Sequence, residues 1–362
     1  MTSRRVLSIQ SHIVSGYCGN KAATFPLQLL GFDVDVMNTV NFSNHTGYPS
    51  WTGEKATGEQ LTKLFEGLQT SSLVDYTHIL TGYIGSSQNL AAVTDIVAKL
   101  EDHGNPFFVL DPVMGDNGQL YVQPDVIPLY KNLMKFAKAI TPNQFEAEVL
   151  ADKKVTDVRS CMEVIDILHD AGVENVVITS VSLLPSDVAA HQAVGQNGAT
   201  SNGASKREEA EEESMYCVCS NRRSKDDTPR VFAIGFPTYD GYFTGTGDLF
   251  SALLVARLDE AIQQEAGSSL EGQEKSAPVT NGHLGARKET ALSRACIKVV
   301  ATMRAVVLRT YQAQKGSTGR SLDRTLASSA AVVKRCELQL IQSKRDIEQP
   351  EESDVEVIEL RR

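Results

Sequence analysis

The stretch Thr244-Gly245-Thr246-Gly247-Asp248 combines residue types that could move a phosphoryl group. It stands shortly before the apolar segment Ser251–Leu258, which we expect to be helical. Two glycines let backbone amides converge without Cβ atoms in the way. The first turn of a helix adds unpaired N–H groups and the positive end of the helix dipole. The pattern therefore predicts an anion hole for a phosphoryl group.

Asp248 would stand at the start of this helix, where it could face a reacting hydroxyl. An ordinary aspartate pKa of about 3.9 predicts a carboxylate at neutral pH. A general base of this kind typically contributes about 10²–10⁴ in rate. The same residues also allow a plain turn in which Asp248 only caps the helix. The stretch is not a Walker A loop, because Gly-Lys-Ser/Thr is missing, and no dinucleotide fingerprint follows the first predicted strand.

The elements that would position these groups alternate between short β-type runs and helix-type segments. The predicted strands are Val6–Ile9, Asp33–Thr39, His78–Leu80, Phe107–Leu110, Lys138–Ile140, Val176–Ile178 and Met215–Ser220. The predicted helices are Asn20–Leu30, Gly58–Leu68, Leu90–Leu100 and Glu289–Gln314. This order predicts one α/β domain in three layers, with a mostly parallel sheet between helices. Ligands bind outside the carboxyl ends of such strands. The polar residues expected at those ends are Ser11, Thr81, Asp111, Thr141 and Thr179.

Composition narrows the classes of partner. The 362 residues carry a net charge of -10, which disfavours nucleic acid and anionic lipid as partners. No apolar run approaches the ~20 residues that cross a bilayer. Six scattered cysteines indicate free thiols and a cytoplasmic protein, with the nucleus as an alternative. Cys217 and Cys219 are expected on alternate faces of a strand. Ala193–Ser214 and Gln263–Lys288 are polar and are predicted to be flexible insertions.

Several longer stretches carry a resemblance to a known family. They are Val6–His12 with Gly16–Ala23, Phe42–Tyr48, Leu80–Tyr83, Asp111–Asp116, Thr141–Glu148 and Gln342–Glu348. With Gly-Thr-Gly-Asp they resemble the ribokinase-like superfamily and, within it, the eukaryotic pyridoxal kinases. The resemblance covers nearly the whole chain outside the two insertions. It implies ATP-dependent phosphorylation of the 5′-hydroxymethyl group of pyridoxal, pyridoxine and pyridoxamine by a homodimer. It also implies a divalent cation (Mg²⁺, or another such as Zn²⁺) and a monovalent cation (K⁺ or Na⁺).

The resemblance also implies roles for single residues. Asp248 would be the base, and Gly245, Thr246 and Gly247 would form the anion hole. The vitamer would contact Ser11, Val40, Phe42, His45, Thr46, Tyr83 and Thr244. ATP would lie near Asp111, Asp116, Tyr121, Thr141, Asn143, Glu146, Thr179, Ser180 and Phe243, and on the amides of Gly245–Gly247. The cations would lie near Asp111, Thr141, Glu146 and Thr179. Thr244 departs from the family pattern, in which an aliphatic residue is expected, so substrate preference is left open.

Three alternatives remain at this stage. The first is a hydroxymethylpyrimidine kinase of the same superfamily, although the stretch His45-Thr46-Gly47-Tyr48 favours pyridoxal. The second is a vitamer-binding protein without catalysis, which the intact Gly-Thr-Gly-Asp, Asp111 and Glu146 disfavour. The third is an acidic interaction protein that works through Glu208–Glu213. That last function would require the acidic run, whereas a kinase would keep its activity without it.

Overall fold

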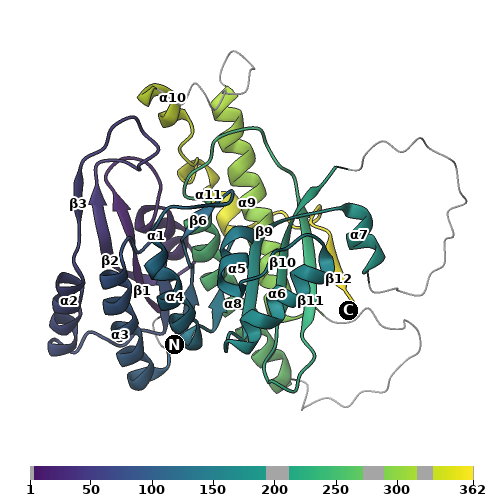
Figure 1. Ribbon diagram of the computed structural model, residues 1–362, viewed down its shortest axis with the longest axis horizontal. Coiled ribbons are helices and arrows are strands. Elements are labelled where there is room, and N and C mark those ends of the chain that lie inside the picture. The colour runs from purple at the N-terminus through teal and green to yellow at the C-terminus, as the bar shows by residue number, and fades with distance from the viewer. Residues whose placement is uncertain (1–3, 193–211, 272–288, 316–328, 362) are drawn as a thin grey trace, which may run out of the picture.

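A computed structural model of the protein describes residues 4–192, 212–271, 289–315 and 329–361. Ten strands form one sheet in the order β12-β11-β10-β9-β8-β5-β4-β1-β2-β3, which runs across Figure 1 from β3 to β12. The parallel part contains β1 (Arg5–Ile13), β2 (Asp33–Phe42), β4 (His78–Thr81), β5 (Phe107–Leu110), β8 (Ala139–Ile140) and β9 (Asn175–Leu183). The antiparallel strands are β3 (Gly53–Lys55), β10 (Ser214–Asn221), β11 (Arg230–Phe236) and β12 (Val357–Leu360). The predicted mostly parallel sheet is confirmed.

Helices cover both faces of the sheet, because successive strand residues point to opposite sides and most are apolar. In β1, for example, Leu7 faces one core and Val6 the other. The helices packed on the Leu7 side are α2 (Gly58–Thr70), α3 (Ser87–Gly104), α4 (Ile127–Leu133), α5 (Gln144–Ala151) and α6 (Val158–Asp170). The helices on the Val6 side are α1 (Asn20–Leu29), α8 (Thr246–Glu271), α9 (Ala291–Lys315) and α11 (Lys344–Glu348).

The remaining elements are short. They are the hairpin of β6 (Gly115–Asp116) and β7 (Gln119–Leu120), the helices α7 (Pro185–Ala190) and α10 (Ala330–Arg335), and the 3-10 helices Pro124–Val126, Met134–Phe136 and Ile341–Ser343. No helix in the described ranges is both long enough and apolar enough to cross a membrane.

The register of the parallel strands places their carboxyl ends at one rim. Ile9 pairs with Thr81, Thr81 with Leu110, Leu110 with Ile140, and Ile140 with Val176. The residues that follow this row are therefore neighbours across the sheet. They include Asp111 and Thr141, which the sequence predicts at this edge.

Four details of the prediction are wrong. Residues 263–271 belong to α8 rather than to an insertion, since Glu, Gln and Ala are good helix formers. Ser214 begins β10 instead of ending an insertion, and β9 continues past Thr179 to Leu183 because β10 pairs with it there. Cys217 and Cys219 share one face and meet Cys296 of α9, as residues two apart on a strand must. The other residues of both predicted insertions lie outside the described ranges, apart from Glu212 and Glu213.

Candidate active site

The glycine-rich stretch leads directly into α8, as predicted. The backbone of Gly245 is in the left-handed region at a φ of +82°, and a Cβ there would overlap the carbonyl oxygen of Tyr17. Only glycine fits this position without strain. The helix starts at Thr246, so the amides of the following residues belong to its first turn. The stretch therefore presents unpaired N–H groups and a positive dipole end beside the β1–α1 connection.

Asp248 reaches out of its own helix. Its Oδ2 accepts a hydrogen bond of 2.7 Å from the N–H of Gly19, which lies between β1 and α1. Asp248 is 8% exposed, while Gly247 before it is exposed. Burial raises the pKa of Asp248, against hydrogen bonds from Gly19 and the Cys18 thiol that lower it. The expected ordinary aspartate pKa is thus corrected upward.

Asp111 directly follows the carboxyl end of β5, and its carboxylate is near those of Asp248 and Glu146. It is buried, and its Oδ2 has no hydrogen-bond partner. A Cβ placed on Gly247 would be 3.8 Å from this oxygen, so Asp111 adjoins the anion hole. Burial and then the charges of Glu146 and Asp248 raise the pKa of Asp111 well above its usual range. An orphaned carboxylate oxygen among like charges is typical of a cation site.

Thr141 ties the strand ends to α8. Its Oγ1 lies 2.8 Å from Oγ of Ser251, and both side chains are buried. Ser251 follows Asp248 by three residues, which places both on the same face of the helix. The two hydroxyls hold the first turn of α8 over the end of β8.

Glu146 is held by backbone groups rather than exposed on a helix face. Its Oε1 accepts N–H groups of Met114 at 2.8 Å and Gly115 at 3.3 Å, and its Oε2 accepts the N–H of Asn143 at 3.0 Å. Asn143 caps α5 in return and donates through Nδ2 to the carbonyl of Gly115. Burial raises the pKa of Glu146 to about 7, although these three amides oppose the shift. Direct metal coordination by Glu146 would compete with these bonds.

The expected vitamer contacts gather on the other side of Asp248. Val40 and Phe42 form a small apolar cluster with Ile13, against which Cys18 and Tyr83 pack. Ser11 is buried in β1 at a register shift, where it pairs with Val40. His45 is buried as well, whereas Thr46 is exposed. Phe243 and Thr244 are half-buried directly before Gly245.

The expected nucleotide contacts spread along the rim. Thr179 lies within β9 and bonds through its N–H to the carbonyl of Pro142 at 2.9 Å, and Ser180 follows it half-buried. Asp116 is exposed in the β6–β7 hairpin, and Tyr121 just after it is 61% exposed. Asp116 is near enough to Glu146 for its charge to contribute to the raised pKa of Glu146.

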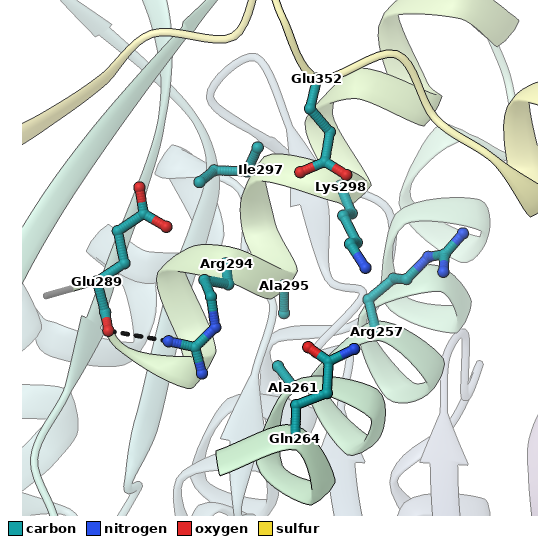
Figure 2. A pocket seen from close by; sticks show the side chains of 9 residues that line it. All are labelled: Arg257, Ala261, Gln264, Glu289, Arg294, Ala295, Ile297, Lys298 and Glu352. Atoms are coloured by element: carbon teal, nitrogen blue, oxygen red, sulfur yellow. Dashed lines mark hydrogen bonds between the residues drawn. The ribbon is translucent and has the colours of Figure 1, made fainter. Parts of the chain in front are cut away.

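A hollow between α8 and α9 belongs to a different part of the molecule. Figure 2 shows it beside the cationic side chains of Arg257, Arg294 and Lys298. Glu260 pairs with Arg257 at 2.8 Å and with Lys298 at 2.7 Å, and Glu265 pairs with Arg294 at 2.8 Å. These two carboxylates offset much of the cationic charge, and Glu289 and Glu352 also line the hollow, so its charge does not indicate an anion site.

Sequence reasoning missed three residues that shape the site. Ser251 had a detectable signal, the three-residue spacing from Asp248. Gly19 lies in a stretch that carried the resemblance, but nothing local indicates that its N–H faces Asp248. Glu337 lies 289 residues from its partner Tyr48 and gave no local signal at all.

Comparisons with known proteins show which family the whole chain resembles. A family model described as phosphomethylpyrimidine kinase matches residues 43–213. Pyridoxal kinase of Homo sapiens is 38% identical over 354 residues, which cover 96% of each chain. Pyridoxal kinase of Arabidopsis thaliana is 43% identical over 253 residues, covering 69% of this chain and 73% of the relative. The structure of pyridoxal kinase from Leishmania donovani in complex with ADP and pyridoxamine matches with a TM-score of 0.73 at 29% identity. It covers 99% of this chain and 100% of that chain.

Proposed function

Because the chain belongs to the pyridoxal kinase family and is an ATP-dependent kinase of pyridoxal vitamers, we propose that Asp248 is the general base of that reaction. The 5′-oxygen attacks the γ-phosphorus, its proton passes to Asp248, and the bond to the β-phosphate oxygen breaks to release ADP. The raised pKa of Asp248 suits this task, since it brings the base closer to neutral pH. The observation that carries the proposal is this buried carboxylate at the first turn of α8, directly after Gly-Thr-Gly.

The amides of Gly245, Thr246 and Gly247 are proposed to stabilise the charge on the moving phosphoryl group. Phosphoryl transfer needs positioning and charge neutralisation more than covalent help from the protein. The left-handed backbone of Gly245 and the dipole of α8 supply both without rearrangement during the reaction. This preorganisation is the reason that a short stretch suffices.

The vitamer is proposed to bind where the small apolar cluster meets polar groups. Val40, Phe42 and Tyr83 would frame the ring, and Ser11 would hydrogen-bond its substituents. His45, Thr46 and Thr244 complete the proposed set. An apolar pocket with a few oriented polar groups is the usual environment for such a ring.

The nucleotide and the cations are proposed to occupy the opposite side of Gly247. The proposed ATP contacts are Asp111, Asp116, Tyr121, Thr141, Asn143, Glu146, Thr179, Ser180 and Phe243. The orphaned Oδ2 of Asp111, with the carboxylate of Glu146 near enough to raise the pKa of Asp111, fits a divalent cation such as Mg²⁺ or Zn²⁺. Among the described residues no three acidic, histidine or cysteine side chains form a complete metal site, so ATP oxygens or water would supply further ligands. Such a cation would neutralise phosphate charge, and K⁺ or Na⁺ would lie near Thr141 and Thr179.

We also propose a cellular setting and an assembly for the enzyme. All six cysteines are free, which fits the reducing cytoplasm, with the nucleus as the alternative. The homodimer rests on the family resemblance. No nucleic acid or membrane partner is proposed, since the net charge of -10 disfavours both.

A substrate comparison tests the function. We expect ATP consumption and a phosphorylated product with pyridoxal, pyridoxine and pyridoxamine, and at least about tenfold lower kcat/KM with hydroxymethylpyrimidine. The second substrate is the necessary control, because a family model named for phosphomethylpyrimidine kinase also matches. A higher kcat/KM on hydroxymethylpyrimidine, or vitamer binding without turnover, would refute the proposed function.

A further inference from the structure

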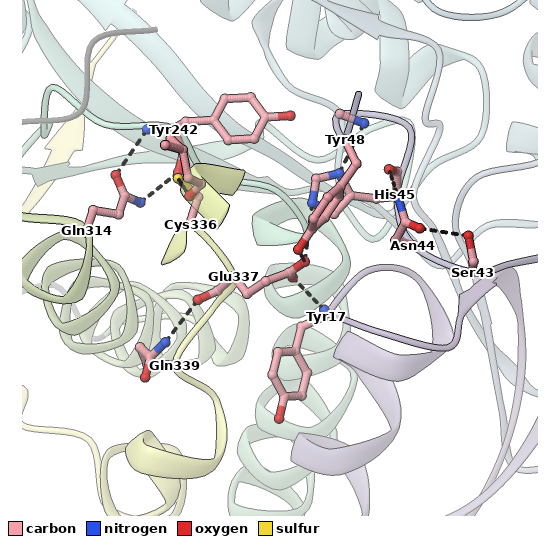
Figure 3. A network of polar contacts seen from close by, with 12 residues as sticks. Tyr17, Ser43, Asn44, His45, Tyr48, Tyr242, Gln314, Cys336, Glu337 and Gln339 are labelled. Carbon is pink, nitrogen blue, oxygen red and sulfur yellow. Dashed lines mark hydrogen bonds and ion pairs between the residues drawn. The ribbon is translucent and has the colours of Figure 1, made fainter. Parts of the chain in front are cut away.

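Glu337 brings together three segments that are far apart in the sequence. It lies shortly after α10 and is only 8% exposed. Figure 3 shows its carboxylate between the Tyr17 backbone and the rings of His45 and Tyr48. Oε2 accepts the N–H of Tyr17 at 2.8 Å, Oε1 accepts the hydroxyl of Tyr48 at 2.9 Å, and Oε1 lies 3.4 Å from Nε2 of His45.

The loop His45–Tyr48, on one side of Glu337, is also held together by contacts between its own residues. Nδ1 of His45 accepts the N–H of Gly47 at 3.1 Å, so the ring proton of a neutral His45 lies on Nε2 and points at Glu337. The rings of His45 and Tyr48 meet edge to face with centroids 4.7 Å apart. This orientation of His45 therefore depends on Glu337 at one nitrogen and on the loop backbone at the other.

The segment on the other side of Glu337 leads to the proposed base. Tyr17 is followed by Cys18 and Gly19, and Gly19 donates its N–H to Asp248. A Cβ on Gly16 would overlap the Glu337 carboxylate, so the two approach as closely as glycine permits. One carboxylate thus contacts both the loop proposed to bind the vitamer and the segment that holds the base.

We infer that Glu337 is a positioning residue, which fixes the loop His45–Tyr48 relative to Tyr17–Gly19 and so sets where the vitamer lies with respect to Asp248. The inference rests on the proposed vitamer contacts. Glu337 contacts no reacting atom in this scheme and acts through His45, Tyr48 and Tyr17. The hydrogen bonds and ion pair of Glu337 involve Tyr17, His45, Tyr48 and Gln339, none of which is a proposed ATP contact, so we expect its effect to fall on the vitamer.

Steady-state kinetics of Glu337→Gln test the inference. We expect KM for pyridoxal to rise at least about tenfold while KM for ATP stays within about twofold. Glu348→Gln is the matched control, because it makes the same change at an exposed site on the same terminal segment and should leave both constants unchanged. An unchanged KM for pyridoxal, or an equal rise in both KM values, would overturn the inference.

A second variant keeps the inference testable if Glu337→Gln does not fold. Tyr48→Phe removes a single hydroxyl from the network and keeps the ring, so KM for pyridoxal should rise about two- to fivefold. In the double variant, KM for pyridoxal should rise by less than the product of the two single-variant rises, since both substitutions act through one contact. Full additivity would contradict a shared role.

Variants of the loop separate this inference from the proposed function. His45→Ala and Thr46→Ala should each raise KM for pyridoxal if the loop binds the vitamer. If neither does, the proposed vitamer site is wrong and the inference falls with it. If both do and Glu337→Gln does not, only the positioning role of Glu337 is wrong.

Discussion

Two groups of buried carboxylates in this protein are equally hidden from solvent but differ in their partners. Asp111, Glu146 and Asp248 are 3%, 4% and 8% exposed at the carboxyl ends of the parallel strands, and Glu337 is 8% exposed near the C-terminal segment. Asp111 has an oxygen without a hydrogen bond, whereas both oxygens of Glu337 accept one. Asp111 is therefore short of donors, whereas Glu337, like Glu146 with its three amide donors, accepts hydrogen bonds at both oxygens.

The pKa values respond accordingly. Burial and then the neighbouring carboxylates raise the pKa of Asp111. Burial also opposes ionisation of Glu337, but hydrogen bonds from His45, Tyr17 and Tyr48 outweigh it and lower the pKa. Burial by itself therefore does not decide the charge of a carboxylate. The balance of burial, donors and neighbouring charges decides: donors outweigh burial at Glu337, whereas three amides do not at Glu146. A buried carboxylate with too few donors is suited to bind a cation or accept a proton.

The largest expected effect concerns Asp248. Asp248→Asn should keep the fold but lose more than about 100-fold in kcat, because an amide cannot accept the proton of the attacking hydroxyl. The measurement is turnover with pyridoxal and saturating ATP, with circular dichroism to confirm folding. Near-normal turnover would show that Asp248 is not the base. Asp248 would then no longer belong with Asp111 and Glu146 as a carboxylate of the active site.

The two groups should respond with opposite signs when one charge is removed. Asp111→Asn should raise the free energy of unfolding of the ligand-free protein by about 1–2 kcal/mol at neutral pH while lowering turnover, because it relieves repulsion from Glu146 and Asp248. Glu337→Gln should lower the free energy of unfolding by about 1–3 kcal/mol, because it disrupts satisfied hydrogen bonds. Chemical denaturation measures both. If both variants changed the free energy of unfolding in the same direction, the contrast between Asp111 and Glu337 would be wrong.

The smallest expected effect is the pH dependence of the difference in free energy of unfolding between each of these two variants and the wild type. A lowered pKa means that Glu337 stabilises the fold above its unfolded pKa of about 4.3, and that this is lost as the pH falls through the folded pKa. A raised pKa means that Asp111 is tolerated when protonated and destabilises the fold as the pH rises through the folded pKa. Both variants should therefore approach the wild-type stability as the pH falls. Unfolding curves at several pH values check this, and a difference that grows in acid would contradict the shifts.

Local patterns made part of this site predictable. The alternation of strands and helices along the chain follows from runs such as Phe107–Leu110, and Gly245–Asp248 needs only two glycines before an apolar helix. Asp111 was placed at the rim because it follows a buried strand. These features depend on residues that are close together in the sequence, so they can be recognised from one sequence alone.

Features that depend on distant partners were out of reach. The N–H of Gly19 meets Asp248 across 229 residues, and the carboxylate of Glu337 has no nearby motif. The unpaired Oδ2 of Asp111 could not be foreseen either, since a missing partner leaves no trace in the sequence. The prediction that Cys217 and Cys219 lie on opposite faces was wrong for another reason. Residues two apart on a strand share a face, so the sequence already contained the correct answer.

The bond between Tyr17 and Glu337 joins positions 320 residues apart, almost the full length of the chain. The entropy lost on closing such a loop grows only with the logarithm of its length, so the distance adds little to its thermodynamic cost. Its consequence is temporal. A ribosome makes the loop that contains His45 and Tyr48 well before the side chain that anchors it, since Tyr48 and Glu337 are 289 residues apart. The growing chain therefore holds this loop without its anchor until Glu337 has been synthesised.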